Sequence, residues 1–360
     1  MNREESCFSL SSNSCKYTWA EIKLPSNQGV YGIASNPATG FTVMAGGAFS
    51  SGNSGFIATS NDMIIWTQRS TPNNKSLVGI TFSPTLGMYV AVGRNQAGTQ
   101  VLDQIITSTN GIDWTEVVLS ATKSYNLNAV TWSHQLDLFC AIGTRWGGDD
   151  ADKTPSTFTS PDGINWTQQT PAMENSNFAY DICWSKELQI FCAVGIYCNE
   201  AYGSLVATSP DGINWTHQIC STPTNGILRG ICWSSELNLF VATGTVTALD
   251  GYIYTSPDAV TWTSRFYASK YLRQVSWSSD AREFVAVGSG GYIVHSTDGM
   301  IWNQMYSGNN ATIRCVNYNE KIKRWILGAA AVGADSFVSI SSSRYIKGVF
   351  FEDIKTYKKK

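Results

Sequence analysis

Short apolar runs recur in groups of three along this chain, and a polar turn and a tryptophan follow most groups. In the fifth group the runs cover 228–234, 239–244 and 252–256, and the second run ends in a glycine. Residues that are apolar at consecutive positions are typical of strands covered on both faces. The first run of the group occurs seven times, at 31–35, 77–83, 127–133, 179–185, 228–234, 272–278 and 313–319. The pattern predicts seven units built of short β-strands.

The polar turn after the third run is the most repetitive stretch of the sequence, and we call it the box. It reads Ser-Pro-Asp-Gly-Ile-Asn-Trp at 160–166 and 209–215, with looser copies at 60–66, 108–114, 256–262 and 296–302. The boxes end in the tryptophans Trp66, Trp114, Trp166, Trp215, Trp262 and Trp302. Successive box tryptophans are 48, 52, 49, 47 and 40 residues apart, and a repeat of this length is typical of solenoids, propellers and similar arrays.

The residue types of the box predict a tight turn with its own hydrogen bonds. Proline has a φ already close to that required at the second position of such a turn, and glycine supplies a positive φ two residues later. The serine and aspartate oxygens are expected to accept bonds from amides of the same turn, under a tryptophan that starts the next strand. The carboxylate or amide position is filled by Asp62, Asn110, Asp162, Asp211, Asp258 and Asp298.

Four short strands repeated about seven times predict an all-β fold, a seven-bladed β-propeller of four-stranded antiparallel blades. The seventh unit has no box, but 17–22 resembles the strand that begins with the box tryptophan, and Trp19 precedes Trp66 by 47 residues. We expect this N-terminal strand to complete the last blade, because a closed ring leaves no free sheet edge. The predicted domains are an N-terminal extension at 1–16, the propeller at 17–345 and a basic C-terminal tail at 346–360. This tail either docks on the propeller, binds a partner or stays in solvent.

The boxes resemble the Asp-box, or bacterial-neuraminidase, repeat of sialidases and related propellers. That family's pattern is Ser-x-Asp-x-Gly-x-Thr-Trp, and the boxes of this chain are one residue shorter between aspartate and tryptophan. The shorter form is similar to repeats of propellers in bacteriophage and other viral or bacterial surface proteins. The resemblance covers nearly the whole chain and implies a propeller. It implies no activity, because Asp boxes also occur in propellers that are not enzymes.

Composition narrows the functional classes. Charged residues make up 14% of the chain and the net charge is -2, so the chain has no charge signature of a nucleic-acid-binding or membrane-surface protein. Residues 1–16 lack the apolar core of a signal peptide, and no apolar run is long enough to span a bilayer. The nine cysteines form no Cys-x-x-Cys pair and the three histidines lie in separate repeats. We therefore expect buried thiols, no metal site and no cofactor.

Alignment of the first strands brings three arginines to one position in consecutive repeats. The seven residues at this position are Tyr31, Val78, Asn128, Tyr180, Arg229, Arg273 and Arg314. If these strand starts surround the central channel, three adjacent blades contribute guanidinium groups, whose forks match carboxylate and phosphate. Sialidases likewise hold their substrate's carboxylate with three arginines from different blades, so the resemblance implies an acidic-sugar site that also involves the two tyrosines. The alternative is that each arginine covers apolar surface and pairs with a neighbouring carboxylate.

A second candidate surface is the long loop at 144–156. It carries Arg145 and Trp146, followed by glycines and aspartates. An aromatic face can pack on the C–H groups of a sugar while carboxylates accept bonds from its hydroxyls, so we predict sugar or partner contact there. The alternative is a solvated acidic loop with Trp146 folded onto a neighbouring blade.

Catalysis of the sialidase type needs a tyrosine nucleophile activated by a glutamate, and an aspartate acid. No glutamate falls at an equivalent inner position, and we assign no catalytic residue. We predict a non-enzymatic binding or structural propeller, a tail or receptor-binding component of a phage or virus particle that contacts a host-surface glycan or a neighbouring virion protein. The expected location is a virion made in a host cytoplasm, with an extracellular or cytoplasmic protein as alternatives. The alternative functions are a sialidase-like glycoside hydrolase acting on acidic sugars and an intracellular assembly scaffold.

Overall fold

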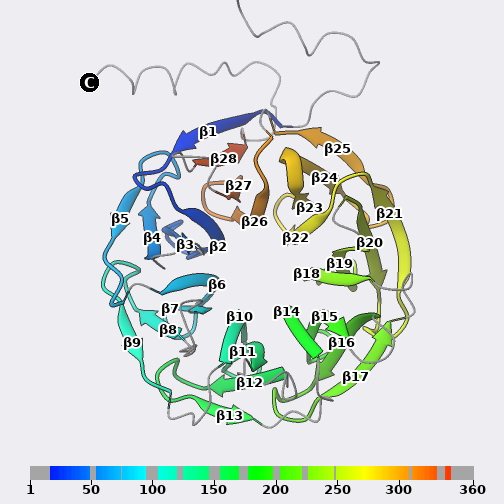
Figure 1. Cartoon of the computed structure of the whole chain (residues 1–360), viewed down its shortest axis with the longest axis horizontal. Helices are drawn as coiled ribbons and strands as arrows, with labels where there is room; N and C mark the ends of the chain where they lie inside the picture. Colours follow the sequence, from blue (N-terminus) through cyan, green and yellow to red (C-terminus); the bar gives the residue numbers. More distant parts are fainter. Residues whose placement is uncertain are drawn as a thin grey trace, which may run out of the picture.

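The computed structural model describes residues 17–48, 54–73, 75–94, 104–119, 125–145, 155–169, 177–197, 203–220, 226–246, 249–307, 310–330 and 337–341. In these residues the strands form seven four-stranded antiparallel sheets arranged in a ring (Figure 1). The predicted seven-bladed β-propeller is confirmed.

In six of the seven blades the strands run in chain order from the centre of the ring to its rim (Figure 1). Blades 1 to 3 are β2 (Gly29–Ser35), β3 (Thr42–Ala48), β4 (Ser54–Ser60), β5 (Thr67–Arg69); β6 (Ser76–Ser83), β7 (Met88–Arg94), β8 (Gln104–Ser108), β9 (Thr115–Val117); and β10 (Tyr125–Ser133), β11 (Leu138–Arg145), β12 (Pro155–Ser160), β13 (Thr167–Gln169). Blades 4 to 6 are β14 (Asn177–Ser185), β15 (Ile190–Tyr197), β16 (Gly203–Ser209), β17 (Thr216–Cys220); β18 (Ile227–Ser234), β19 (Leu239–Thr245), β20 (Gly251–Ser256), β21 (Thr263–Ala268); and β22 (Leu272–Ser278), β23 (Glu283–Gly288), β24 (Tyr292–Ser296), β25 (Asn303–Tyr306). A short 3-10 turn, η1 (Ser289–Gly291), joins β23 to β24.

Blade 7 joins the two ends of the described chain. Its inner strands are β26 (Ile313–Asn319), β27 (Arg324–Ala329) and β28 (Phe337–Ser341), and its outer strand is β1 (Trp19–Lys23). The antiparallel register runs from Trp19 opposite Ser341 to Lys23 opposite Phe337. The prediction that the N-terminal strand completes the last blade is confirmed.

The core lies between neighbouring blades. Every residue of β23 is buried, as predicted for strands whose two faces are both covered by other blades. Ile253 of blade 5 packs with Val275 and Phe284 of blade 6 in one cluster. Cys140 and Cys192, at core positions of the second strands, are buried free thiols, as the sequence predicts.

The box turns contain the expected hydrogen bonds. In blade 3 the amide of Gly163 donates to the Ser160 hydroxyl (2.9 Å), and the amides of Ile164 and Asn165 donate to one oxygen of Asp162 (2.9 and 2.7 Å). Partial burial raises the pKa of Asp162, but these bonds outweigh it and lower the pKa to about 2. The indole of Trp166 donates back to the carbonyl of Gly163 (2.8 Å). The outer strands begin one residue after the tryptophan rather than at it, because the indole belongs to the turn.

Glycine is not obligatory at the fourth box position. Gly163 has φ 73°, and Met63 and Ala259 adopt φ 64° and 61° at the equivalent place. Their side chains are fully buried, so packing offsets part of the strain of a left-handed backbone. In the described part of the chain, no helix is both long and apolar enough to span a membrane.

Candidate functional site

A β-bulge occurs near the start of the inner strand in all seven blades. In each case the strand pairing skips one residue, and the skipped residues are Tyr31, Val78, Asn128, Tyr180, Arg229, Arg273 and Arg314. A bulge leaves one residue unpaired and re-aims its side chain. The seven positions aligned in the sequence are therefore the seven residues that the bulges turn toward the channel.

In blades 1 to 6 the glycine that ends the second run pairs with the residue just before the bulge, whereas blade 7 has Ala329 in this place, opposite Ile313. A Cβ on Gly195 would lie 1.8 Å from the carbonyl oxygen of Phe178, and one on Gly288 would lie 2.0 Å from that of Tyr271. Such distances are impossible for a real side chain, so the backbone of these six blades requires glycine in the neighbouring strand. The glycine is a sequence signal for the bulge.

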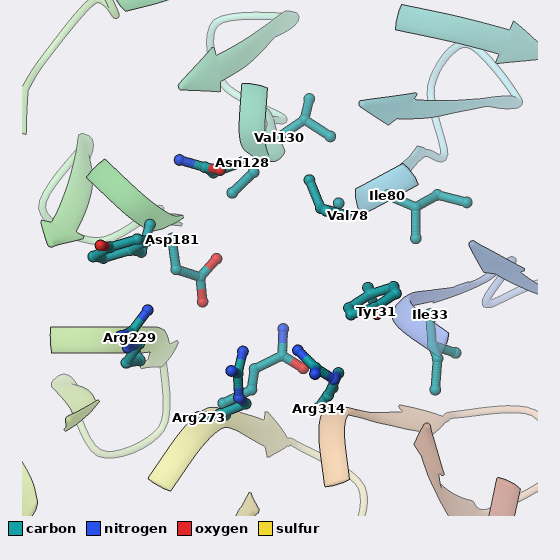
Figure 2. Close-up of a pocket in the computed structure, with 15 residues that line it drawn as sticks. Tyr31, Ile33, Val78, Ile80, Asn128, Val130, Asp181, Arg229, Arg273 and Arg314 are labelled. Atoms are coloured by element: carbon teal, nitrogen blue, oxygen red, sulfur yellow. The ribbon is translucent and has the colours of Figure 1, made fainter. Parts of the chain in front are cut away.

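The bulge residues line a cavity of about 190 Å³ at the centre of the ring (Figure 2). Arg229, Arg273 and Arg314 lie along one side of it, from blades 5, 6 and 7. The opposite side comes from blades 2 and 3 and consists of the apolar Val78, Ile80 and Val130 together with the polar Asn128 (Figure 2). The cavity therefore has a cationic wall that faces a mainly apolar one.

Tyrosines hold the two ends of the arginine row. The guanidinium carbon of Arg229 lies 4.6 Å from the ring centre of Tyr180, and that of Arg314 lies 4.8 Å from the ring centre of Tyr31. Such cation–π contacts orient a guanidinium without neutralising its charge. The structure thus brings together five of the sequence-predicted ligand residues in one cavity, and ligand binding there stays a prediction.

The positive charge of the arginine row is not neutralised by carboxylates. Among the described residues none of the three arginines forms an ion pair, and the buried Nε atoms of Arg273 and Arg314 have no hydrogen-bond partner. Burial lowers the pKa of Arg229, an effect that Tyr180 opposes and the charge of Arg273 reinforces. Burial and the charge of Arg273 lower the pKa of Arg314 as well. Guanidinium groups nevertheless stay protonated in proteins, so three cations repel one another in a partly desolvated site.

Asp181 is the carboxylate that lines the cavity. Its side chain points into the cavity (Figure 2), where one oxygen accepts a bond from the amide of Ile182 (2.9 Å) and the other from the amide of Ile231 in blade 5 (3.0 Å). Burial raises the pKa of Asp181 to about 7, although both amide bonds act in the opposite direction. The group is therefore close to half-protonated at neutral pH.

Polar side chains around the cavity also join one blade to the next. The side-chain oxygen of Gln274 accepts a bond from the backbone amide of Val316 (2.7 Å). The side-chain amide of Asn128 donates to the backbone carbonyl of Ala179 (2.7 Å). Asp181 and Gln274 occupy the same place, one residue after the bulge, and sequence reasoning assigned no role to Gln274. The signal was a polar side chain at a position held by glycine in blades 1, 2 and 5.

The structure does not test the other two predicted ligand residues, Arg145 and Trp146. Arg145 ends β11, but its side chain and the whole of Trp146 lie outside the described residues. His, Cys, Asp and Glu side chains of the described residues form no group of three that could hold a metal ion. The chemistry that the site offers is recognition of a negatively charged group.

Comparison with known proteins supports the fold alone. No protein-family model matches the sequence, and no curated protein matches it either. The structure is similar to the WD40 β-propeller domain of Doa1, with a TM-score of 0.62 at 10% identity over 91% of this chain and 97% of that one. It is also similar to streptogramin B lyase, with a TM-score of 0.66 at 10% identity over 92% and 99%. At such low identity the chain shares with these proteins the architecture of a β-propeller, and no function follows.

Proposed function

We propose that this protein is a non-enzymatic binding propeller whose central cavity holds an anionic ligand. The observation that carries the proposal is the row of Arg229, Arg273 and Arg314, which has no carboxylate partner among the described residues and in which the buried Nε donors of Arg273 and Arg314 are unpaired. Desolvated donors and charges cost free energy unless they are paired. A carboxylate or phosphate supplies the missing acceptors and charge-assisted hydrogen bonds.

The ligand that fits both walls is an acidic sugar. Its carboxylate would bind the arginines, and the C–H face of its ring would pack on Val78 and Val130, opposite them. The volume of about 190 Å³ is smaller than the roughly 300–1,000 Å³ of sites for drug-sized ligands. We therefore expect one terminal sugar, rather than an internal stretch of a glycan chain, to enter the cavity.

We further infer that the protein is a tail or receptor-binding component of a phage or virus particle, which contacts a host-surface glycan or a neighbouring particle protein. Support comes from the sequence: a surface poor in charge, and boxes that resemble those of viral and bacterial surface propellers. An intracellular assembly scaffold would share the fold, but it would give no reason for unneutralised arginines in the channel.

A glycoside hydrolase of the sialidase type is the second candidate, because its active site also combines three arginines with tyrosine. Tyr31 and Tyr180 line the cavity, but each ring is covered by an arginine and no glutamate lines the cavity beside them. A lowered pKa would favour a tyrosine nucleophile, and Tyr271 has one: burial raises its pKa, but the hydrogen bond and charge of Arg273 lower it overall. Tyr271 does not, however, line the cavity. Binding is therefore the better-supported function.

The test is calorimetric titration with sialyllactose and with lactose, which lacks the carboxylate. We expect the charged sugar alone to bind, and Arg273→Ala to weaken binding by at least about tenfold, the scale of a lost charge-assisted bond. Arg265→Ala is the matched control, because this arginine lies on β21, the outer strand of blade 5, and donates a bond to Thr255 of β20. Arg273→Gln replaces the alanine variant if that one fails to fold. Equal binding of both sugars, or equal affinity of wild type and Arg273 variants, would contradict the proposal.

A glycan array with wild type and Trp146→Ala examines the loop at 144–156. Loss of signal for long glycans with unchanged binding of sialyllactose would assign Trp146 to an outer subsite. Hydrolysis of a reporter sialoside that disappears in Arg273→Ala would favour the glycosidase instead.

A further inference from the structure

Exposed apolar side chains are concentrated on one face of the propeller. We call this the box face: it is formed by the boxes and by the turns between the first and second strands, which lie at the same end of each blade because its strands are antiparallel. Eleven of the fourteen exposed large apolar side chains of the described residues belong to it. They are Leu86, Leu136, Leu188 and Leu237 in the turns, and Ile65, Ile112, Ile164, Ile213, Val260, Met300 and Ile301 in the boxes.

Because these eleven side chains repeat from blade to blade, they form a ring on the box face, which we call the aliphatic ring. The exposed fractions run from 37% for Leu237 to 68% for Ile301, and each of blades 1 to 6 contributes from the box, the turn or both. Single exposed aliphatic residues are normal on protein surfaces, whereas gathered ones mark sites of interaction. The aliphatic ring therefore has the character of an interaction surface.

The box face is also acidic. The connections that form it hold four basic side chains, Lys186, Arg282, Lys321 and Lys323. They hold eleven carboxylates that reach the surface, Asp62, Asp113, Asp137, Asp162, Glu187, Asp211, Glu236, Asp258, Asp280, Asp298 and Glu320. Because the whole chain has a net charge of only -2, negative charge is concentrated on this face. A complementary occupant is both apolar and basic.

The polypeptide leaves the propeller on this face. β28 ends at Ser341. The hydroxyl of Ser341 accepts a bond from the amide of Trp325 (2.9 Å), near the start of β27. This end of the two strands is the one that carries the turn at 320–323, which belongs to the box face. Residues 342–360 lie outside the described residues. They contain six basic and two acidic residues, together with the apolar segment Val349-Phe350-Phe351. The segment that starts at the acidic, apolar face has the complementary composition.

We propose that residues 342–360 dock on the box face of their own molecule, with Phe350 and Phe351 on the aliphatic ring and the lysines over the box carboxylates. The eight residues from Ser341 to Val349 span at most about 27 Å when extended, and packed sheets lie roughly 10 Å apart. The aromatic residues therefore reach the boxes of blades 6 and 1 on either side of blade 7. Docking makes this segment an internal ligand that any other apolar, basic partner has to displace.

The test is photo-crosslinking from p-benzoylphenylalanine in place of Phe350 in the full chain. Mixing of isotopically light and heavy chains separates crosslinks within one molecule from those between two. We expect crosslinks within one chain to Met300, Ile301 or Ile65. Crosslinks found only between chains, crosslinks to the opposite face, or none would overturn the proposal.

Matched variants separate specific docking from proximity. Ile301→Asn is expected to reduce the crosslink yield severalfold, whereas Leu249→Asn is not. Leu249 is 78% exposed but lies between β19 and β20, at the other face. Replacement of Lys358, Lys359 and Lys360 by glutamate is expected to reduce the yield at low salt, because it makes the segment acidic. An unchanged yield in both Ile301→Asn and the lysine variant would also overturn the proposal.

Discussion

The box of blade 2 shows how interchangeable the partners in one turn are. In blades 3 and 4 the side-chain amide of the sixth box residue donates to the carboxylate of the third. Asn165 donates to Asp162 and Asn214 to Asp211, both at 2.7 Å. In blade 2 the two residue types are exchanged, and Asn110 donates to Asp113 at 2.9 Å. Both arrangements keep one amide donor and one carboxylate acceptor, which is the property that the turn requires.

Asn110→Asp restores the box consensus and yet should destabilise the protein. It places two carboxylates at the distance of a hydrogen bond, and we expect a loss of about 1 kcal/mol in the free energy of unfolding, since the pair is exposed and screened. Adding Asp113→Asn to the same chain recreates the arrangement of blade 3 and should recover the loss. Urea unfolding measures both, and a double variant no more stable than the single one would contradict the exchange.

Asp181 should make anion binding depend on pH. With its pKa raised to about 7, the carboxyl is neutral below this pH and becomes an anion in the cavity above it. A bound anion raises the pKa of Asp181 further, so binding takes up a proton and the affinity falls as the pH rises above about 7. The groups that interact with it electrostatically are the thiols of Cys183 and Cys232, whose own pKa values are raised by burial; neither titrates near neutrality.

Calorimetry in two buffers of different ionisation enthalpy detects this proton uptake in the wild type, and Asp181→Asn should bind with an affinity independent of pH. Wild-type affinity that is equally flat between about pH 6 and 8 would show that the carboxyl does not sense the ligand.

The inner strands are joined across blades by one recurring bond at the box face. The indoles of Trp184, Trp233 and Trp277 donate to Gln135 (2.7 Å), Glu187 (2.6 Å) and Glu236 (2.8 Å) in the turn of the preceding blade. The equivalent Trp132 is buried, and no described residue bonds to its Nε1. Its counterpart in the turn of blade 2 is Thr85, which is too short to reach it.

Thr85→Gln should therefore stabilise the protein. A new partner for a buried donor contributes about 1 kcal/mol, which thermal or urea unfolding resolves. The reverse change in blade 3, Gln135→Thr, should leave Trp184 unpaired and cost a similar amount. Stability unchanged in both variants would show that these indoles do not need the bond.

Much of each blade could be predicted from the sequence because the blade is built from local signals. Apolar runs gave the strands, and the box gave the turn with its hydrogen bonds. In blades 1 to 6 the glycine that ends the second run marks the bulge, because a side chain at the Gly195 position would collide with the carbonyl of Phe178. The bonds between blades could not be predicted, because they join Trp233 to Glu187 or Ile231 to Asp181 across a register that no single repeat contains.

The molecule as a whole is closed at blade 7 without a box. Trp19 stands where the other blades have a box tryptophan, but blade 7 has no box carbonyl to receive its Nε1, which has no hydrogen-bond partner among the described residues. Instead the hydroxyl of Tyr17 donates to the fully buried Glu283 of blade 6 (2.7 Å), which also contacts Nδ1 of His295 (2.5 Å). The sequence predicted which segments meet, from the spacing of Trp19 and Trp66, but gave no sign of this contact between distant residues.

If the bond from Tyr17 to Glu283 holds the ring shut, Tyr17→Phe should loosen blade 7 before the rest of the molecule. Losing a bond to a buried carboxylate costs about 1.5–3 kcal/mol. Hydrogen exchange should therefore become faster in β1 and β28, while amides of blades 2 to 4 keep their protection. Tyr318→Phe is the matched control, since its hydroxyl bonds to the exposed Asp280 at the same pair of blades and contributes less. Equal exchange in β1 for both variants would mean that strand pairing alone, without the tyrosine, closes the propeller.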